Sequence, residues 1–277
     1  MTRFLDDLGH VVALPRAPRR VVSLVPSLTE AVAWSAPETL VAATDWCSHV
    51  GPAQVTRIGG TKNPRVDEIV ALAPDLVIAE DEENRPDDLA ALRAAGVPVW
   101  TTQVRSVADA LRSIGRLVDA LAVGRVTWLD DARRAWAAPP AVRSGCRLRA
   151  VVPVWRRPWM AVGSQTYAGD VLRHLGVDNV LARHPDRYPT VVLPDLPPVD
   201  LVVLPDEPYR FTAADGPDAF PRARCALVDG RALTWYGPAM IAAPERLVRQ
   251  LRRPLDPREA GATTSAQPRR GGLLRGS

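Results

Sequence analysis

The sequence predicts an α/β protein in which two Rossmann-like α/β lobes are joined by a rigid helical bridge. Short β-branched runs alternate with helical segments from residue 20 to residue 101, and the alternation returns after Gly145. Between Ser106 and Ala138 no strand signal occurs, and the apolar residues keep helical spacing. Strands that alternate with helices through short connections are typical of parallel sheets. We therefore expect an N-terminal lobe over residues 1–104, a helical bridge over 105–140, a C-terminal lobe over 141–251 and a disordered Arg-rich tail over 252–277.

The first lobe begins with a buried strand at 20–25, Arg-Val-Val-Ser-Leu-Val. The segment Pro26-Ser27-Leu28-Thr29-Glu30 follows it, and Ser27 and Glu30 have the spacing of a capping box, so we expect a helix to begin there. This turn lies at the carboxyl end of a strand, where open α/β sheets place ligands. The other elements expected in this lobe are strands at 40–44, 75–79 and 97–101 and helices at 66–72 and 86–95.

The bridge and the second lobe follow the same logic. Apolar residues from 111 to 121 keep helical spacing, Gly124 interrupts them, and a second helix is expected over 126–137. The segments 75–82 and 200–207 share the pattern Asp-Leu-Val-apolar-apolar-x-Asp-Glu, which indicates two similar halves with an acidic pair after each strand. The C-terminal lobe is expected to hold strands at 148–154, 201–204 and 226–228 and helices at 168–175 and 244–251.

The composition excludes several classes of protein. With 277 residues and 47% hydrophobic content, the chain can bury a substantial core. No apolar run reaches 18 residues, so a membrane-spanning helix is not expected. From Arg252 to the end there are six arginines and two acidic residues, a surplus equal to the whole net charge of +4. The basic character therefore belongs to the tail, and no nucleic-acid partner is expected.

Two motifs resemble a known family. The segments 20–30 (Arg-Val-Val-Ser-Leu-Val-Pro-Ser-Leu-Thr-Glu) and 67–77 (Asp-Glu-Ile-Val-Ala-Leu-Ala-Pro-Asp-Leu-Val) are similar to those of the vitamin B12 and iron-chelate binding proteins of ABC importers. The resemblance extends from about Asp6 to Leu251, with the cobalamin-binding branch nearest through 44–46 and Trp235. It implies two α/β lobes joined by a rigid helix, a ligand cleft between the lobes, no catalysis and no covalent cofactor. The implied ligand is a metal chelate, with cobalamin or a related corrinoid first.

Loop tryptophans suit such a ligand. A corrinoid is a large flat ring with polar edges, and indoles offer broad contact area and one N–H donor. Four of the eight tryptophans fall in loops after predicted strands, whereas Trp34, Trp100, Trp128 and Trp136 lie within predicted elements and are expected to pack. The residues that we expect to bind ligand are Pro26, Ser27, Trp46, Trp155, Trp159, Asp206, Glu207, Trp235 and Tyr236.

His49 is the candidate for contact with the metal of the chelate, because neutral imidazole is the commonest protein ligand of transition metals. A local structural role for this loop histidine is the alternative. Three widely spaced cysteines form neither a zinc motif nor a disulfide framework, and a single thiol such as Cys47 is weak evidence for a metal site.

The resemblance also implies a membrane partner. Acidic residues on both lobe tips dock on an ABC permease in this family, and Asp67 or Glu68 matches the first position, whereas Gly237 follows Trp235-Tyr236 where the second acid would stand. The N-terminus shows no signal peptide. We therefore expect a cytoplasmic monomer that works as a carrier or sensor, with an extracytoplasmic importer component as the alternative if translation starts upstream.

Two other functions stay open at this point. One is an iron-siderophore or haem receptor, which Arg156-Arg157 between two tryptophans would suit. The other is a cytoplasmic enzyme of tetrapyrrole metabolism such as a chelatase, which needs a histidine with an acidic partner at the metal. The sequence contains none of the common nucleotide-binding, metalloprotease or hydrolase motifs.

Overall fold

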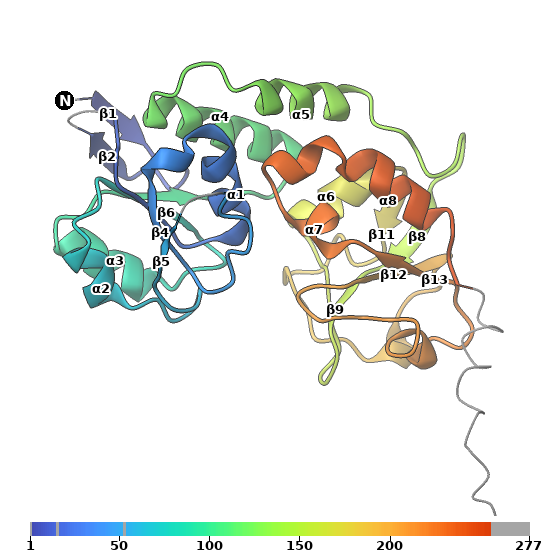
Figure 1. Ribbon diagram of the computed structural model, residues 1–277. Coiled ribbons are helices and arrows are strands. Elements are labelled where there is room, and N and C mark those ends of the chain that lie inside the picture. Colours follow the sequence, from blue (N-terminus) through green and yellow to red (C-terminus); the bar gives the residue numbers. More distant parts are fainter. Residues whose placement is uncertain (1, 15–16, 52–53, 256–277) are drawn as a thin grey trace, which may run out of the picture.

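A computed structural model describes residues 2–14, 17–51 and 54–255, and it contains two α/β lobes joined by two helices (Figure 1). The N-terminal lobe holds a five-stranded parallel sheet of order β5-β4-β3-β6-β7. Its strands are β3 (Val21–Ser23), β4 (Leu40–Ala43), β5 (Thr56–Arg57), β6 (Leu76–Glu80) and β7 (Val99–Thr102), and its helices are α1 (Pro26–Ser35), α2 (Val66–Ala71) and α3 (Pro86–Ala94).

The C-terminal lobe holds a four-stranded parallel sheet of order β11-β8-β12-β13. Its strands are β8 (Leu148–Val151), β11 (Val177–Asn179), β12 (Leu201–Pro205) and β13 (Cys225–Val228), and its helices are α6 (Tyr167–His174), α7 (Gly230–Thr234) and α8 (Ala243–Leu251). Every residue of β6 and of β12 is buried, as expected of parallel strands that are covered on both faces. The predicted α/β fold with two lobes is confirmed.

Some short elements were not predicted. They include the hairpin of β1 (Thr2–Leu5) and β2 (Val11–Leu14), the edge strands β5 and β11, and a second hairpin of β9 (Pro153–Trp155) and β10 (Met160–Ala161). The expected strand at 148–154 is divided into β8 and β9 at Val152. Segments of two to four residues are too short to show a period, so the sequence pattern carries no signal for them.

The start of α1 corrects one expectation. The helix begins at Pro26, its N-cap is Val25, and no side chain caps it. Ser27 and Glu30 are both buried inside the helix, so they form no capping box. Proline favours the first helical position because its missing N–H would have no partner there and its φ is already helical.

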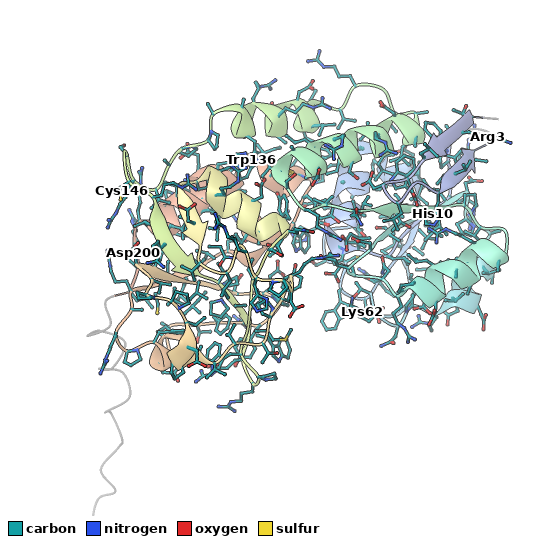
Figure 2. All side chains as sticks on the ribbon, turned by 180° about the vertical axis from the view of Figure 1, so that it is seen from behind. Arg3, His10, Lys62, Trp136, Cys146 and Asp200 are labelled. Atoms are coloured by element: carbon teal, nitrogen blue, oxygen red, sulfur yellow. The ribbon has the colours of Figure 1, made fainter. Side chains whose placement is uncertain are left out.

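The bridge consists of α4 (Val107–Leu121) and α5 (Thr127–Ala137), which run along one side of both lobes (Figure 1). Arg116 of α4 donates to Asp7 Oδ1 of the first lobe at 2.8 Å. Trp136 of α5 lies between that helix and the second lobe (Figure 2), where its Nε1 donates to the Met240 carbonyl at 3.0 Å. One continuous hydrophobic cluster contains buried residues of both lobes and of both bridge helices. This shared core joins the bridge helices to both lobes, and the rigidity of the bridge stays a prediction.

Candidate functional site

The lobes meet in two contact regions, and each region contains an ion pair. Glu82, which follows β6, pairs with Arg187 of the C-terminal lobe, and Tyr188 donates its hydroxyl to Glu82 Oε2 at 3.2 Å. On the other side, Glu30 of α1 pairs with Arg231 of α7. In both pairs the N-terminal lobe supplies the carboxylate and the C-terminal lobe supplies the guanidinium.

The second contact region also joins aromatic groups. The rings of His49 and Trp235 meet edge to face, with centroids 5.5 Å apart. The Arg231 guanidinium lies over the Trp235 indole at 5.3 Å from its centroid. Tyr236 is buried and shares a hydrogen bond with Thr102 of β7 at 3.3 Å. Trp235 and Tyr236, predicted to bind ligand, therefore lie where the lobes touch.

Glu83 and Tyr188, one from each lobe, are exposed beside the ion pair of Glu82 and Arg187. The surrounding protein partly desolvates both side chains, which raises the pKa of each.

Two of the predicted tryptophans are exposed, and the Trp155 ring meets Tyr209 edge to face at 5.7 Å between centroids. Trp46 follows β4 and is 71% exposed, and Trp155 ends β9 and is 44% exposed. Exposed indoles are costly to leave in water, and they are typical of surfaces that receive an apolar partner. We define the interlobe site by Trp46, His49, Glu82, Glu83, Trp155, Tyr188 and Trp235, together with Glu207, whose side chain interacts with Trp235.

An acidic cluster forms the N-terminal wall of this site. Glu80 is buried at the end of β6, and its Oε2 accepts hydrogen bonds from the backbone amides of Glu82 and Glu83 at 2.7 and 2.9 Å. Burial and the neighbouring Asp81 raise the pKa of Glu80. Arg105 lies among the acids, and it pairs with Asp81 and lies 3.1 Å from Glu82 Oε1.

Other predicted site residues differ in their surroundings. Asp206 is exposed and accepts a hydrogen bond from the amide of Gly230 at 2.7 Å, whereas Glu207 is partly buried. Trp159 is stacked on Phe211 at 5.9 Å within a cluster inside the C-terminal lobe, so packing explains its position. Trp34, expected to pack, is instead 59% exposed. Pro26 begins α1 and is partly buried.

His49 and Cys47 show no metal-binding arrangement of their own. The imidazole Nδ1 of His49 lies 2.9 Å from the Ser48 hydroxyl. The thiol of Cys47 is buried and accepts a hydrogen bond from Thr29 at 3.0 Å. Within residues 2–14, 17–51 and 54–255, no three His, Cys, Asp or Glu side chains are placed to hold a metal ion. Contact between His49 and the metal of a bound chelate stays a prediction.

The predicted docking residues lie apart from the interlobe site. Asp67 and Glu68 are exposed in the first turn of α2, and Glu68 pairs with Arg65 at 2.7 Å. Gly237 is buried, and a Cβ placed there would lie 3.1 Å from the Ser27 carbonyl oxygen of the other lobe. Gly237 therefore lies where the lobes meet, and docking on a permease stays a prediction.

Several residues of the site escaped the sequence analysis. Arg187 and Tyr188 belong to a polar loop without periodicity, and Arg231 lies in a five-residue helix. One sequence pattern did point to this region: the acidic pair Asp81-Glu82 follows a strand in the first half as Asp206-Glu207 does in the second. This repeat indicated that both acidic pairs lie at the end of a strand. It could not show which residues of the other lobe would contact them.

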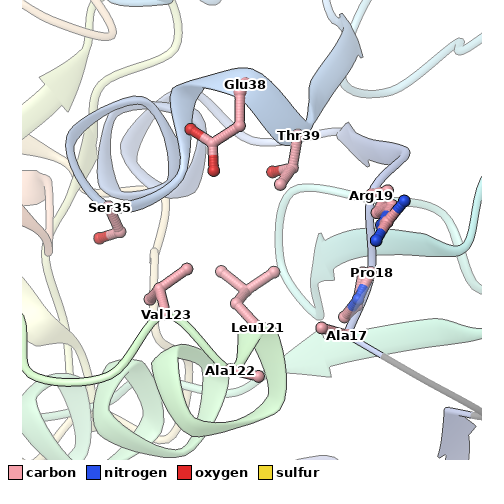
Figure 3. A pocket seen from close by; sticks show the side chains of 9 residues that line it. All are labelled: Ala17, Pro18, Arg19, Ser35, Glu38, Thr39, Leu121, Ala122 and Val123. Atoms are coloured by element: carbon pink, nitrogen blue, oxygen red, sulfur yellow. The ribbon is translucent and has the colours of Figure 1, made fainter.

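A separate pocket of about 540 Å³ lies away from these loops (Figure 3). It is bounded by the end of α1, the 3₁₀ helix Pro37–Thr39 and the end of α4, and Glu38, Leu121 and Val123 line it. This pocket lies at the carboxyl end of α1, whereas Pro26 at the amino end of α1 lies next to the strand ends. It therefore does not belong to the interlobe site.

Known proteins resemble this chain. The vitamin B12-binding protein of Vibrio parahaemolyticus is 25% identical over 62% of this chain and 64% of its own length, which is less than two thirds of that protein. The crystal structure of the periplasmic vitamin B12 binding protein BtuF of Vibrio cholerae matches with a TM-score of 0.66, 20% identity and coverage of 86% of this chain and 98% of that one. A periplasmic heme binding protein from Pseudomonas aeruginosa matches with a TM-score of 0.66, 22% identity and coverage of 86% and 95%.

These similarities correct the expected location. The family whose model matches this chain is described as periplasmic binding protein, and a cytoplasmic assignment conflicts with that, so the expectation of a cytoplasmic protein was wrong. In the part of the chain that the structure describes, none of the helices has the length and apolar character needed to cross a membrane. The model of the family described as periplasmic binding protein matches residues 21–192, more than half of the sequence. The chain belongs to this periplasmic binding protein family.

Proposed function

We propose that the protein reversibly binds a tetrapyrrole-type metal chelate, cobalamin or a related corrinoid first, in the interlobe site. The observation that carries the proposal is the pair of exposed indoles, Trp46 in one lobe and Trp155 in the other. Flat apolar rings gain buried area and favourable ring packing against indoles. The similarity to vitamin B12-binding proteins and to heme-binding proteins supports a chelate of this class.

Membership of a family of binding proteins also bears on catalysis. The family and the relatives consist of substrate-binding proteins, so the protein is not an enzyme. The chelatase alternative has no support from them. We propose that the bound chelate is passed to an ABC permease outside the cytoplasm, with Asp67 and Glu68 as part of the docking surface, and that the protein acts as a monomer.

The weak interlobe ion pair of Arg187 and Glu82 suits reversible binding. Arg187 and Glu82 are 38% and 25% exposed, so their pairing contributes about 0–1 kcal/mol. Such a contact can break and re-form as a ligand enters and leaves. The shared core under the bridge limits how far the lobes can separate, which favours small opening movements over large ones.

Titration by visible spectroscopy and calorimetry tests the proposal, with cyanocobalamin, hemin and a ferric siderophore as separate ligands. We expect cyanocobalamin to bind and the double variant W46A/W155A to weaken binding by about 1–3 kcal/mol for each indole. The matched control is Trp34→Ala, which removes an exposed indole eight residues beyond Pro26, about 12 Å along α1. Equal affinities for the double variant and the parent would refute the site, and tighter binding of hemin would make haem the ligand.

A further inference from the structure

Glu207 stands out among the residues of the interlobe site because its side chain is fixed but incompletely paired. It follows β12 and is partly buried. The Trp235 indole is its hydrogen-bonding neighbour, and Trp235 in turn meets His49 of the other lobe. Glu207 is therefore one side chain away from the N-terminal lobe.

The backbone around Glu207 leaves it little freedom. A Cβ added at Gly230 would lie 2.4 Å from Glu207 Cγ and 2.8 Å from its backbone nitrogen, so α7 approaches this closely only because a glycine begins it. The Gly230 amide also donates to Asp206 Oδ1 at 2.7 Å. These contacts hold the end of β12 and the start of α7 together and fix the position of the Glu207 carboxyl group.

The charges around Glu207 disfavour its ionised form. Asp206 lies beside it on the same strand end, and Asp229 reaches it from the loop after β13. Arg231 is the cation that faces it, and Arg231 is already paired with Glu30 of α1; His49 lies beyond Trp235. The Oε1 atom of Glu207 is covered by protein and has no hydrogen-bond partner among the described residues. A covered, unpaired carboxylate oxygen beside two other carboxylates is costly, so the carboxyl group favours its protonated form.

We propose that Glu207 is a specificity-determining residue that receives an uncharged amide edge of the chelate and rejects a carboxylate at the same place. This inference rests on the proposed function. A neutral carboxyl group has one donor and an acceptor, which match the N–H and C=O of a primary amide. A carboxylate on the ligand would instead enter a region that already holds Asp206, Glu207 and Asp229. Cobalamin carries peripheral amides, whereas haem carries two propionates.

The pKa of Glu207 agrees with this role. Desolvation, with Asp206 and Asp229, raises it to about 7. Below that pH the carboxyl group can donate to an amide, and above it a negative charge adds to the two already present. Discrimination against an acidic ligand should therefore increase as pH rises through about 7, while binding of an amide ligand should change less.

The test uses cyanocobalamin and its monocarboxylic acids, each made by hydrolysing one peripheral amide. We expect wild-type protein at about pH 8 to bind the amide at least about tenfold more tightly than one of the acid isomers, since like charges repel in a partly desolvated site. Glu207→Gln keeps the size and hydrogen-bonding capacity of the neutral acid and removes its titration. It should lower this ratio at pH 8 and abolish its dependence on pH.

The control is Glu245→Gln, which makes the same change at an exposed position in the first turn of α8. It should alter neither the ratio of the two affinities nor the dependence of that ratio on pH. Thermal denaturation of each variant checks that it is folded. If cyanocobalamin binds and Glu207→Gln leaves both the ratio and its pH dependence as in the parent, the role of Glu207 is refuted while the proposed function stands. If no corrinoid binds the wild-type protein, the proposed function itself is refuted.

Discussion

Arg187 of the C-terminal lobe forms an ion pair with Glu82 of the N-terminal lobe, 105 residues earlier in the chain. The loop that carries Arg187 is fixed to its own lobe, because the Gly163 amide donates to the Arg187 carbonyl at 2.7 Å and the Ala161 amide donates to the Pro189 carbonyl at 3.1 Å. The guanidinium therefore moves with the C-terminal lobe, and its contact with Glu82 forms only when the lobes are close.

The first prediction concerns this contact. Arg187→Gln should increase the rate at which a bound chelate dissociates by about two- to fivefold, because the closed arrangement loses up to about 1 kcal/mol. The melting temperature should fall by no more than about 4 °C. Stopped-flow release and thermal denaturation measure the two quantities. Arg134→Gln, which removes a pair with Asp131 within α5, is the control and should not change release. An unchanged release rate for Arg187→Gln would show that the pair does not hold the lobes together.

The second prediction concerns Gly163, which packs against the loop that carries Arg187. A Cβ at Gly163 would lie 2.2 Å from the Asp186 carbonyl oxygen and 3.0 Å from that of Arg187. Both atoms are backbone, so Gly163→Ala must displace the loop, and we expect a loss of about 1–3 kcal/mol in the free energy of unfolding. Chemical denaturation measures it. Gly115→Ala in α4 meets only the end of the Arg133 side chain and should be neutral or stabilising. Wild-type stability of Gly163→Ala would contradict this account.

The third prediction follows from the buried acid Glu80. Burial raises the pKa of Glu80 from the ordinary 4.5 to about 9. Between these two pH values the folded protein binds a proton that the unfolded chain releases. The contribution of Glu80 to stability therefore falls as pH rises through this range. Glu80→Gln removes the titration, and its free energy of unfolding relative to wild type should increase from about pH 5 to about pH 8. Denaturant titrations at several pH values measure the difference. The exposed Glu38→Gln is the control, and a constant difference for Glu80→Gln would refute the assignment.

The sequence predicted the parts of the fold that depend on local pattern. Buried parallel strands such as β6 and β12 appear as continuous apolar runs, and the helical spacing of residues 111–121 located α4. Trp46 and Trp155, which the sequence placed in loops after strands, have exposed indoles. The ligand-binding roles of these residues stay predictions.

What the sequence could not predict depends on contacts between distant residues. Ser27 and Glu30 have the spacing of a capping box, but the Glu30 carboxylate pairs with Arg231, 201 residues later, and a tertiary contact replaces the local one. Trp34 lies within a helix, yet its ring faces solvent. Periodicity shows which residues share a helix face, but it does not show whether another element covers that face. Gly237 was aligned with a docking acid, but it is buried where the lobes meet.

The last prediction concerns the C-terminal boundary. The sequence placed the end of the fold at Leu251, with a disordered tail over 252–277, of which 256–277 lie outside the described residues. Arg252 lies just beyond that boundary, and its Nε and Nη2 donate to the carbonyls of Val142 and Ala141 at 3.0 and 2.8 Å. The Leu255 amide also donates to the Cys225 carbonyl at 2.7 Å, at the edge of β13.

A chain that ends at Leu251 should therefore be less stable than one that ends at Leu255. It loses two contacts of a charged side chain and one backbone hydrogen bond, and at a net value of about 0.5–1.5 kcal/mol for each we expect a deficit of about 1–3 kcal/mol after allowing for solvent exposure. Denaturant unfolding of the two chains measures the difference, and Arg252→Gln in the longer chain should account for part of it. Equal stability of the two chains would return the boundary to Leu251, because the contacts of Arg252 and Leu255 would then contribute nothing to the fold.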